Sequence, residues 1–93
     1  MIITFKNNRT REIFEGKFVK KLPESIASRA NIKLIMMDNA ADLNDLRLPP
    51  SNHLEKLQGD RRGQYSIAIN SQWRICFYYY QGNFYQVEIV DYH

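Results

Sequence analysis

Three titratable side chains stand next to one another at the end of the chain, in the order Asp91, Tyr92, His93. A histidine side chain has a reference pKa of about 6.5, which suits proton transfer near neutral pH, and an adjacent carboxylate stabilises its charged form. These residues therefore form a candidate acid–base site. The competing interpretation is a frayed terminal histidine without a chemical role.

Arginines provide candidate phosphate ligands in the same half of the chain. Arg61 and Arg62 come just before a glycine, where a turn is predicted. Arg74 is expected on the same strand face as Tyr78. Guanidinium groups bind phosphate and aromatic rings stack on unpaired bases, so this combination favours single-stranded nucleic acid. Solvated arginines at a sheet edge are the competing interpretation.

The remaining reactive residue types are isolated. His53 is a candidate base, although a lone histidine in a loop usually has no catalytic role. Cys76 lies between apolar neighbours, where a buried thiol is expected. The sequence has no glycine-rich phosphate loop, no Cys/His pair at metal-ligand spacing and no serine in a nucleophile elbow, so we expect neither a metal nor a cofactor.

The elements that must position these residues change from helical to strand periodicity along the chain. A Pro-Pro pair at residues 49–50 predicts a loop between the two parts, because two prolines stop a helix and favour an extended path. The regular segments expected before it are a strand over residues 1–5, a helix over 8–15 capped by Asn7 or Asn8, a helix over 23–39 and a helical turn over 42–46.

After this loop the apolar residues alternate, which predicts an antiparallel β-meander. The face expected to cover the helices carries Tyr65, Ile67, Ile69, Trp73, Ile75, Phe77, Tyr79, Tyr85, Val87 and Ile89. The opposite face mixes polar, basic and aromatic groups, including Ser66, Arg74, Cys76, Tyr78, Glu88 and Tyr92. We therefore predict an α+β fold with the helices on one face of the sheet and the other face open for a ligand.

Length and charge set the remaining bounds. With 93 residues, 44% of them hydrophobic, the sequence predicts one domain over residues 1–93. The net charge is +3, and residues 1–33 hold eight basic side chains against three acidic ones, so this end of the chain could face a polyanion. One cysteine and no apolar run of membrane-spanning length favour a cytoplasmic protein without a membrane partner.

Four segments in order, at residues 52–63, 66–67, 72–77 and 87–93, resemble the HigB-type toxins, the plasmid-maintenance killer proteins of the RelE/ParE superfamily. The resemblance implies a RelE-like fold and the toxin of a bacterial type II toxin–antitoxin system. It also implies a metal-independent mRNA interferase, an endoribonuclease that inhibits translation by cutting mRNA on the ribosome. The implied partners are the ribosome, mRNA and a cognate HigA-like helix-turn-helix antitoxin.

The resemblance also implies roles for individual residues. His93 would transfer the proton, with Asp91 and Tyr92 orienting it and the acid and base assignments interchangeable. Arg74 and Arg61 would carry the charge on the phosphate while the RNA 2′-hydroxyl attacks it. The further residues expected to bind RNA or phosphate are Arg62, Lys56, His53 and Tyr78.

One segment departs from the family pattern. A branch of the family has His-Pro-Leu-Lys before Gly-Asp-Arg, and Glu55 and Gln58 replace the histidine and lysine here. His53 and Lys56 come two residues earlier in each case, which preserves the face of a strand, so they are the candidate substitutes. The variant segment resembles a milder HigB-like subgroup, and weak toxicity is expected.

Two other functions fit the same fold. ParE-type relatives inhibit DNA gyrase without RNA chemistry, although the ending Asp91-Tyr92-His93 argues against that function. A ribosome-binding or RNA-binding protein without catalysis is the other alternative, because Glu55 and Gln58 replace family residues.

Overall fold

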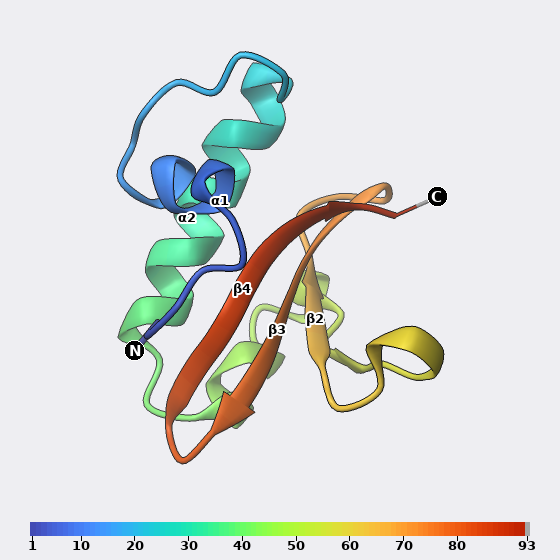
Figure 1. The fold of residues 1–93 in the computed structure, drawn as a ribbon. Coiled ribbons are helices and arrows are strands. Elements are labelled where there is room, and N and C mark those ends of the chain that lie inside the picture. Colours follow the sequence, from blue (N-terminus) through green and yellow to red (C-terminus); the bar gives the residue numbers. More distant parts are fainter. Residues whose placement is uncertain (93) are drawn as a thin grey trace.

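The structure, a computed structural model, describes residues 1–92 and has an α+β fold (Figure 1). The elements are α1 (Asn8–Phe14), α2 (Glu24–Asn39), β1 (Glu55–Lys56), β2 (Tyr65–Ala68), β3 (Trp73–Tyr80) and β4 (Asn83–Asp91). The strands form one antiparallel sheet in the order β1-β2-β3-β4. Both helices lie on one side of this sheet, next to β4, so the predicted layer arrangement is confirmed (Figure 1).

Both helices match the predicted ranges to within one residue at each end. The Asn7 side chain accepts a hydrogen bond of 3.0 Å from the backbone N–H of Thr10, which caps α1. Gly16 follows α1 with a φ of 81°, a left-handed conformation that favours glycine. In α2, a row of side chains at helical spacing is buried: Ile26, Ala30, Leu34 and Met37.

Short 3₁₀ turns link α2 to the sheet. The predicted helical turn is present at Leu43–Arg47, with Asp42 as its cap. The Pro-Pro segment is not purely extended as predicted, because Pro50–Asn52 forms a second 3₁₀ turn. Pro50 occupies the first position of this turn. A backbone N–H at that position would have no hydrogen-bonding partner within the turn, so proline costs no hydrogen bond there.

The N-terminal residues lie alongside β4 without forming the predicted strand. Isolated parallel bridges join Ile2 to Phe84 and Phe5 to Val87. Between these bridges, the N–H of Gln86 donates 2.8 Å to the hydroxyl of Thr4 and not to a backbone carbonyl. The ladder is therefore interrupted at the point where β4 is irregular.

This irregularity is a β-bulge that corrects the predicted face of β4. The register between β3 and β4 shifts after the Cys76–Glu88 pair, and Gln86 has a φ of 53°. As a result Phe84 is fully buried on the helix-facing side, whereas Tyr85 pairs with Tyr78 on the opposite side. The prediction that Tyr85 shares a face with Val87 is therefore wrong.

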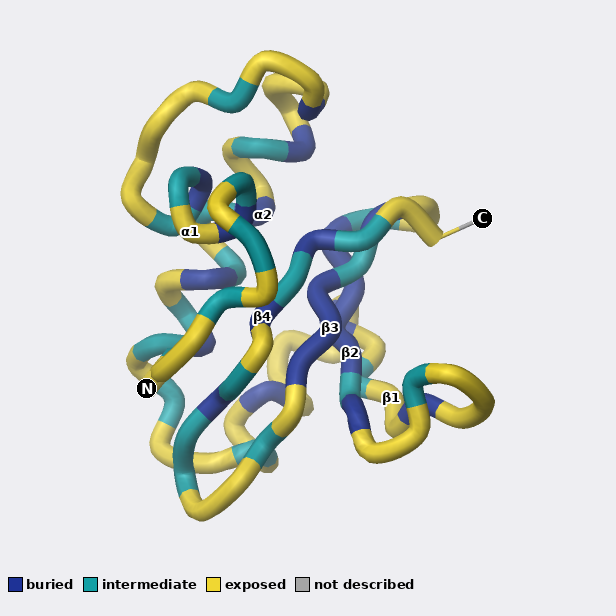
Figure 2. Tube along the Cα trace, viewed as in Figure 1, coloured by how far each residue is buried: buried dark blue, intermediate teal, exposed yellow. Residues whose placement is uncertain are grey.

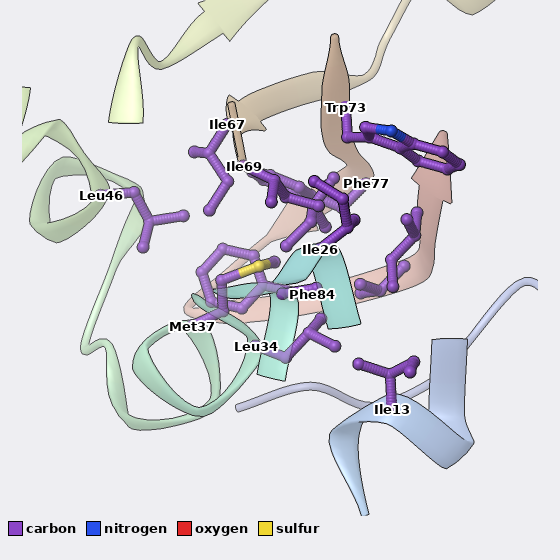
Figure 3. Close-up of a cluster of buried hydrophobic side chains, with 14 of the residues drawn as sticks. Ile13, Ile26, Leu34, Met37, Leu46, Ile67, Ile69, Trp73, Phe77 and Phe84 are labelled. Carbon is purple, nitrogen blue, oxygen red and sulfur yellow. The ribbon is translucent and has the colours of Figure 1, made fainter. Parts of the chain in front are cut away.

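The core fills the space between α2 and the sheet (Figure 3). Phe77 and Phe84 lie at its centre, with their ring centroids 5.3 Å apart in an edge-to-face contact. Leu34 and Met37 reach them from α2, and Leu46 from the 3₁₀ turn. This core fixes the strands on which the candidate site is built.

The other face of the sheet is partly covered, unlike the open face predicted from the alternation. Ser66 and Cys76 lie on that face and are fully buried. Figure 2 shows β2 and the first half of β3 as mostly buried. Arginine side chains lie on this face, because Arg74 donates to the Ser66 hydroxyl and both Arg61 and Arg74 are near enough to act electrostatically on Cys76. A ligand on this face would therefore meet arginines before it met the sheet.

Candidate functional site

Arg74 is the most firmly held of the predicted site residues. Its Nε donates 2.7 Å to the Oγ of Ser66 on the neighbouring strand β2. Its Nη2 donates 2.6 Å to the carbonyl oxygen of His53 and lies 3.8 Å from a carboxylate oxygen of Glu55. The side chain is only 12% exposed. Arg74 therefore has a defined orientation, with β1, β2 and the turn before β1 all contributing to it.

The C-terminal segment runs past this arginine. The guanidinium carbon of Arg74 lies 5.9 Å from the centroid of the Tyr92 ring, within the range of a cation–π contact. The backbone N–H of Tyr92 donates 2.6 Å to the carbonyl oxygen of Gln72, and the Gln72 side chain donates 3.0 Å to Asp91. The structure thus brings Arg74, Asp91 and Tyr92 together at the end of β4.

His93, to which the resemblance gives the proton-transfer role, lies outside the residues that the structure describes. It follows Tyr92 directly in the chain.

Arg61 approaches the same region from the 3₁₀ turn at Gly59–Arg61. Its Nη1 donates 3.1 Å to a carboxylate oxygen of Glu88 and 3.2 Å to the side-chain oxygen of Gln64. Burial opposes the charged form, but the hydrogen bond and the charge of Glu88 outweigh it and raise the pKa of Arg61 above its usual value. The residue therefore presents a permanent positive charge to this face.

A shallow recess of about 410 Å³ lies between Arg61 and the end of β4. Its lining residues are Arg61, Val90, Asp91 and Tyr92. The recess therefore combines a guanidinium group with a carboxylate and a phenol. In the pairing of β3 with β4, Val90 lies opposite Arg74, whereas Asp91 lies opposite the core residue Trp73. Such a recess can accept an anionic group beside proton-transferring side chains.

The remaining predicted residues do not line this recess. Arg62 and Lys56 are exposed, and Lys56 belongs to the edge strand β1. His53 is exposed as well, and its carbonyl holds Arg74. Tyr78 is partly exposed and lies next to Gly63, which follows Arg62 in the chain. A Cβ atom added to Gly63 would lie 3.5 Å from the Tyr78 ring.

The sequence does not predict that both arginines face carboxylates, with Glu88 beside Arg61 and Glu55 beside Arg74. In the sequence, Glu55 stands out only as a replacement of a family residue, and Glu88 only as a polar residue of the predicted open face. The strand alternation places Glu88 on the same face as Arg74, which was a usable signal. The pairing of Glu88 with Arg61 depends on the path of the loop over residues 59–63, which no periodicity encodes.

Cys76 is not suited to act as a nucleophile. Burial raises the pKa of its thiol, and this effect outweighs the opposing influence of Arg61 and Arg74. The reactive thiolate is therefore disfavoured at neutral pH.

Residues 1–92 contain neither a candidate metal site nor a membrane-spanning helix. No three His, Cys, Asp or Glu side chains in this range are grouped so that they could hold a metal ion. No helix in the same range is long and apolar enough to cross a membrane.

The fold resembles that of a chain in a solved structure. A chain of the YoeB–YefM complex from Staphylococcus aureus superposes with a TM-score of 0.60 and 18% identity, covering all of this chain and 95% of that one. This similarity shows that the two chains share a fold. The sequence gives the finer assignment, because residues 3–93 match the family described as the RelE-like toxin of type II toxin–antitoxin system HigB. The chain therefore belongs to the HigB family of type II toxins.

Curated relatives agree with this assignment. The chain is 32% identical over 93 residues to Endoribonuclease HigB of Proteus vulgaris, and the match covers the full length of both chains. It is 35% identical over 83 residues to Toxin HigB-1 of Vibrio cholerae, covering 88% of this chain and 87% of that protein.

Proposed function

We propose that this chain is an endoribonuclease toxin that acts in the cytoplasm and cuts mRNA on the ribosome. The name of the Proteus vulgaris relative supports the activity, since the two chains match along their whole lengths. The attacking group is the RNA 2′-hydroxyl, which adds to the adjacent phosphorus while the bond to the 5′-oxygen breaks. The products are a 2′,3′-cyclic phosphate and a 5′-hydroxyl end.

The observation that carries this proposal is that Arg61 lines one recess with Asp91 and Tyr92, and that Arg74 contacts the Tyr92 ring. The reaction accumulates negative charge on the phosphate, which fixed guanidinium groups stabilise. Arg74 is oriented before RNA arrives, because hydrogen bonds hold both its Nε and its Nη2. A preorganised cation needs little rearrangement as the transition state forms.

Proton transfer is assigned to the end of the chain. His93 exchanges protons with the attacking and leaving oxygens, and Asp91 and Tyr92 orient it. Arg62, Lys56, His53 and Tyr78 bind the flanking RNA around the recess. The exposure of Tyr78 beside the arginine-bearing loop supports stacking on a base.

The proposed activity requires no metal and is weak. Glu55 and Glu88 each occupy one side of an arginine that the phosphate needs. Partly exposed ion pairs contribute only about 0–1 kcal/mol, so RNA can displace or share them at a small cost. We therefore expect cleavage slower than that of a family member with His-Pro-Leu-Lys in this segment, and mild toxicity.

The proposed partners are the ribosome, mRNA and a HigA-like helix-turn-helix antitoxin. The family assignment supports an antitoxin, and the basic excess in residues 1–33 supports docking on ribosomal RNA. A small helix-turn-helix gene beside the toxin gene is the expected source of the antitoxin.

His93→Ala tests the proposed chemistry directly. Primer extension on mRNA from induced cells should show cleavage by the unaltered protein and by Arg47→Ala, an exposed control away from the recess, but at least tenfold less by His93→Ala. Undiminished cleavage by His93→Ala would remove this residue from catalysis. Inhibition of gyrase in a supercoiling assay, or ribosome binding with intact mRNA, would replace the proposal by one of the two alternative functions.

A further inference from the structure

A buried asparagine closes the loop that precedes β1. Asn52 is the last residue of the 3₁₀ turn Pro50–Asn52, and its side chain is fully buried. Its Nδ2 donates 3.1 Å to the carbonyl oxygen of Leu46 and 3.2 Å to that of Leu48. An asparagine amide has two N–H donors, so both have partners within this loop. Because the side chain is shielded from solvent, water does not replace these bonds if the amide is lost.

The same side chain is anchored to α2. The Nζ of Lys33 donates to the Oδ1 of Asn52, and the Sδ of Met36, about one turn further along the helix, lies 3.8 Å from its Nδ2. Leu46, at the start of the loop, is buried in the core (Figure 3). The loop is therefore fixed to the helical layer at both of its ends.

The residue after Asn52 provides an acceptor for Arg74. The carbonyl oxygen of His53 accepts a hydrogen bond of 2.6 Å from the Nη2 of Arg74. His53 has a φ of 45° and a ψ of 56°, a left-handed conformation that a residue with a side chain adopts where its surroundings impose it. The hydrogen bonds of Asn52 belong to those surroundings, because they fix the preceding residue. They therefore help to fix where the His53 carbonyl lies.

We propose that Asn52 is a positioning residue for Arg74, acting through the carbonyl group of His53. Two groups then orient the guanidinium, the hydroxyl of Ser66 at Nε and this carbonyl at Nη2. Glu55 is a weaker determinant, because its carboxylate lies 3.8 Å from Nη2 and is 56% exposed. The effect of Asn52 on cleavage rests on the proposed function, whereas its effect on the orientation of Arg74 does not.

Asn52→Asp tests this role with little change in size. An ionised aspartate only accepts hydrogen bonds, so it would turn an oxygen toward the two carbonyl oxygens that Nδ2 contacts. Asn31→Asp is the matched control. The Asn31 side chain donates 2.9 Å to the carbonyl oxygen of Ile13 and 3.3 Å to that of Phe14, at the end of α1. Each variant thus loses an amide that donates to two carbonyl groups, but only Asn52 is connected to Arg74.

The first measurement is the ¹H–¹⁵N spectrum of the arginine side chains in the purified protein. An Nη2 held by a hydrogen bond rotates slowly and gives a signal of its own, which is assigned to Arg74 by its absence from Arg74→Lys. This signal should be present in the unaltered protein and in Asn31→Asp, and lost in Asn52→Asp. If Asn52→Asp does not fold, Asn52→Ser replaces it with the same expected loss, because serine keeps a single donor.

Three results of this measurement would overturn the proposal. They are the absence of the signal from the unaltered protein, its persistence in a folded Asn52 variant, and its loss from Asn31→Asp as well.

The second measurement is the single-turnover rate of mRNA cleavage on ribosomes saturated with the protein. Asn52→Asp should lower this rate about three- to tenfold, less than the roughly hundredfold that a 1 Å misplacement can cost, because Ser66 still holds Nε. Asn31→Asp should cleave within about twofold of the unaltered protein, and both variants should bind ribosomes within about twofold of it.

A double-variant cycle shows whether the effect passes through Arg74. In an Arg74→Lys background, Asn52→Asp should lower the cleavage rate by less than about twofold, because the guanidinium that it positions is already gone. An equal decrease in both backgrounds, or no decrease in either, would overturn the proposal.

The two measurements separate this inference from the proposed function. An unaltered protein that leaves mRNA intact, while its Arg74 signal is lost only in the Asn52 variants, would refute the proposed activity and not the positioning role. Cleavage by the unaltered protein, with an Arg74 signal that Asn52→Asp leaves in place, would refute the positioning role and not the activity.

Discussion

Replacing Arg74 with lysine preserves the charge of the proposed site and removes its geometry. The guanidinium donates in two directions, 2.7 Å to Ser66 and 2.6 Å to the carbonyl oxygen of His53. One lysine ammonium cannot reproduce this fork. A hydrogen bond to a charged group contributes about 1.5–3 kcal/mol, so losing one of them should lower the free energy of unfolding by about that amount.

The same substitution should slow RNA cleavage. Loss of one charge-assisted hydrogen bond to the phosphate in the transition state, again about 1.5–3 kcal/mol, corresponds to a rate decrease of roughly 10- to 150-fold. The assay is the rate of mRNA cleavage in a purified translation reaction, at a temperature where urea unfolding shows the variant to be folded.

Ser66→Ala is the matched control for this experiment. It removes the buried acceptor of the Arg74 Nε bond but keeps the arginine, so stability should fall while cleavage decreases less than tenfold. A folded Arg74→Lys variant that cleaves within threefold of the unaltered protein would refute the assignment of Arg74 to the phosphate. A variant that only loses stability would make Arg74 a structural residue.

Three predictions concern the sheet, each measured by urea unfolding. Phe84→Ala should cost about 3–5 kcal/mol and Tyr85→Ala clearly less, because only Phe84 faces the core; equal costs would contradict the bulge. Gln86→Gly should stabilise the protein by up to about 1 kcal/mol, since φ is 53° there, and a loss of stability would count against the left-handed conformation. Because burial raises the pKa of Cys76, the native thiol keeps its proton where the unfolded thiol ionises, so stability should fall as pH rises above about 8.5; Cys76→Ala should reduce this slope, and an unchanged slope would contradict the burial effect.

The helices and the regular strands were predictable because local signals suffice for them. Asn7, Gly16 and the spacing of the apolar residues define α1 and α2 without reference to the rest of the chain. Likewise β3 is regular up to Cys76, so alternation placed Arg74 on the face away from the helices.

The bulge in β4 was not predictable from alternation. Gln86 is not a glycine, and its conformation depends on the β3 pairing and on the hydroxyl of Thr4, which is distant in the sequence. The same limit applies to Glu88, because its contact with Arg61 requires the loop to fold back over the sheet. Tertiary contacts between distant residues decide both features.

The chemistry of the cut RNA ends tests the central proposal most directly. Ribosomes carrying a defined mRNA are incubated with the purified protein, and the fragment ends are identified by mass spectrometry. The proposal predicts fragments with a 2′,3′-cyclic phosphate and a 5′-hydroxyl, which disappear when antitoxin is added. Intact mRNA at a protein concentration that saturates the ribosomes, or fragments with a 5′-phosphate, would contradict it.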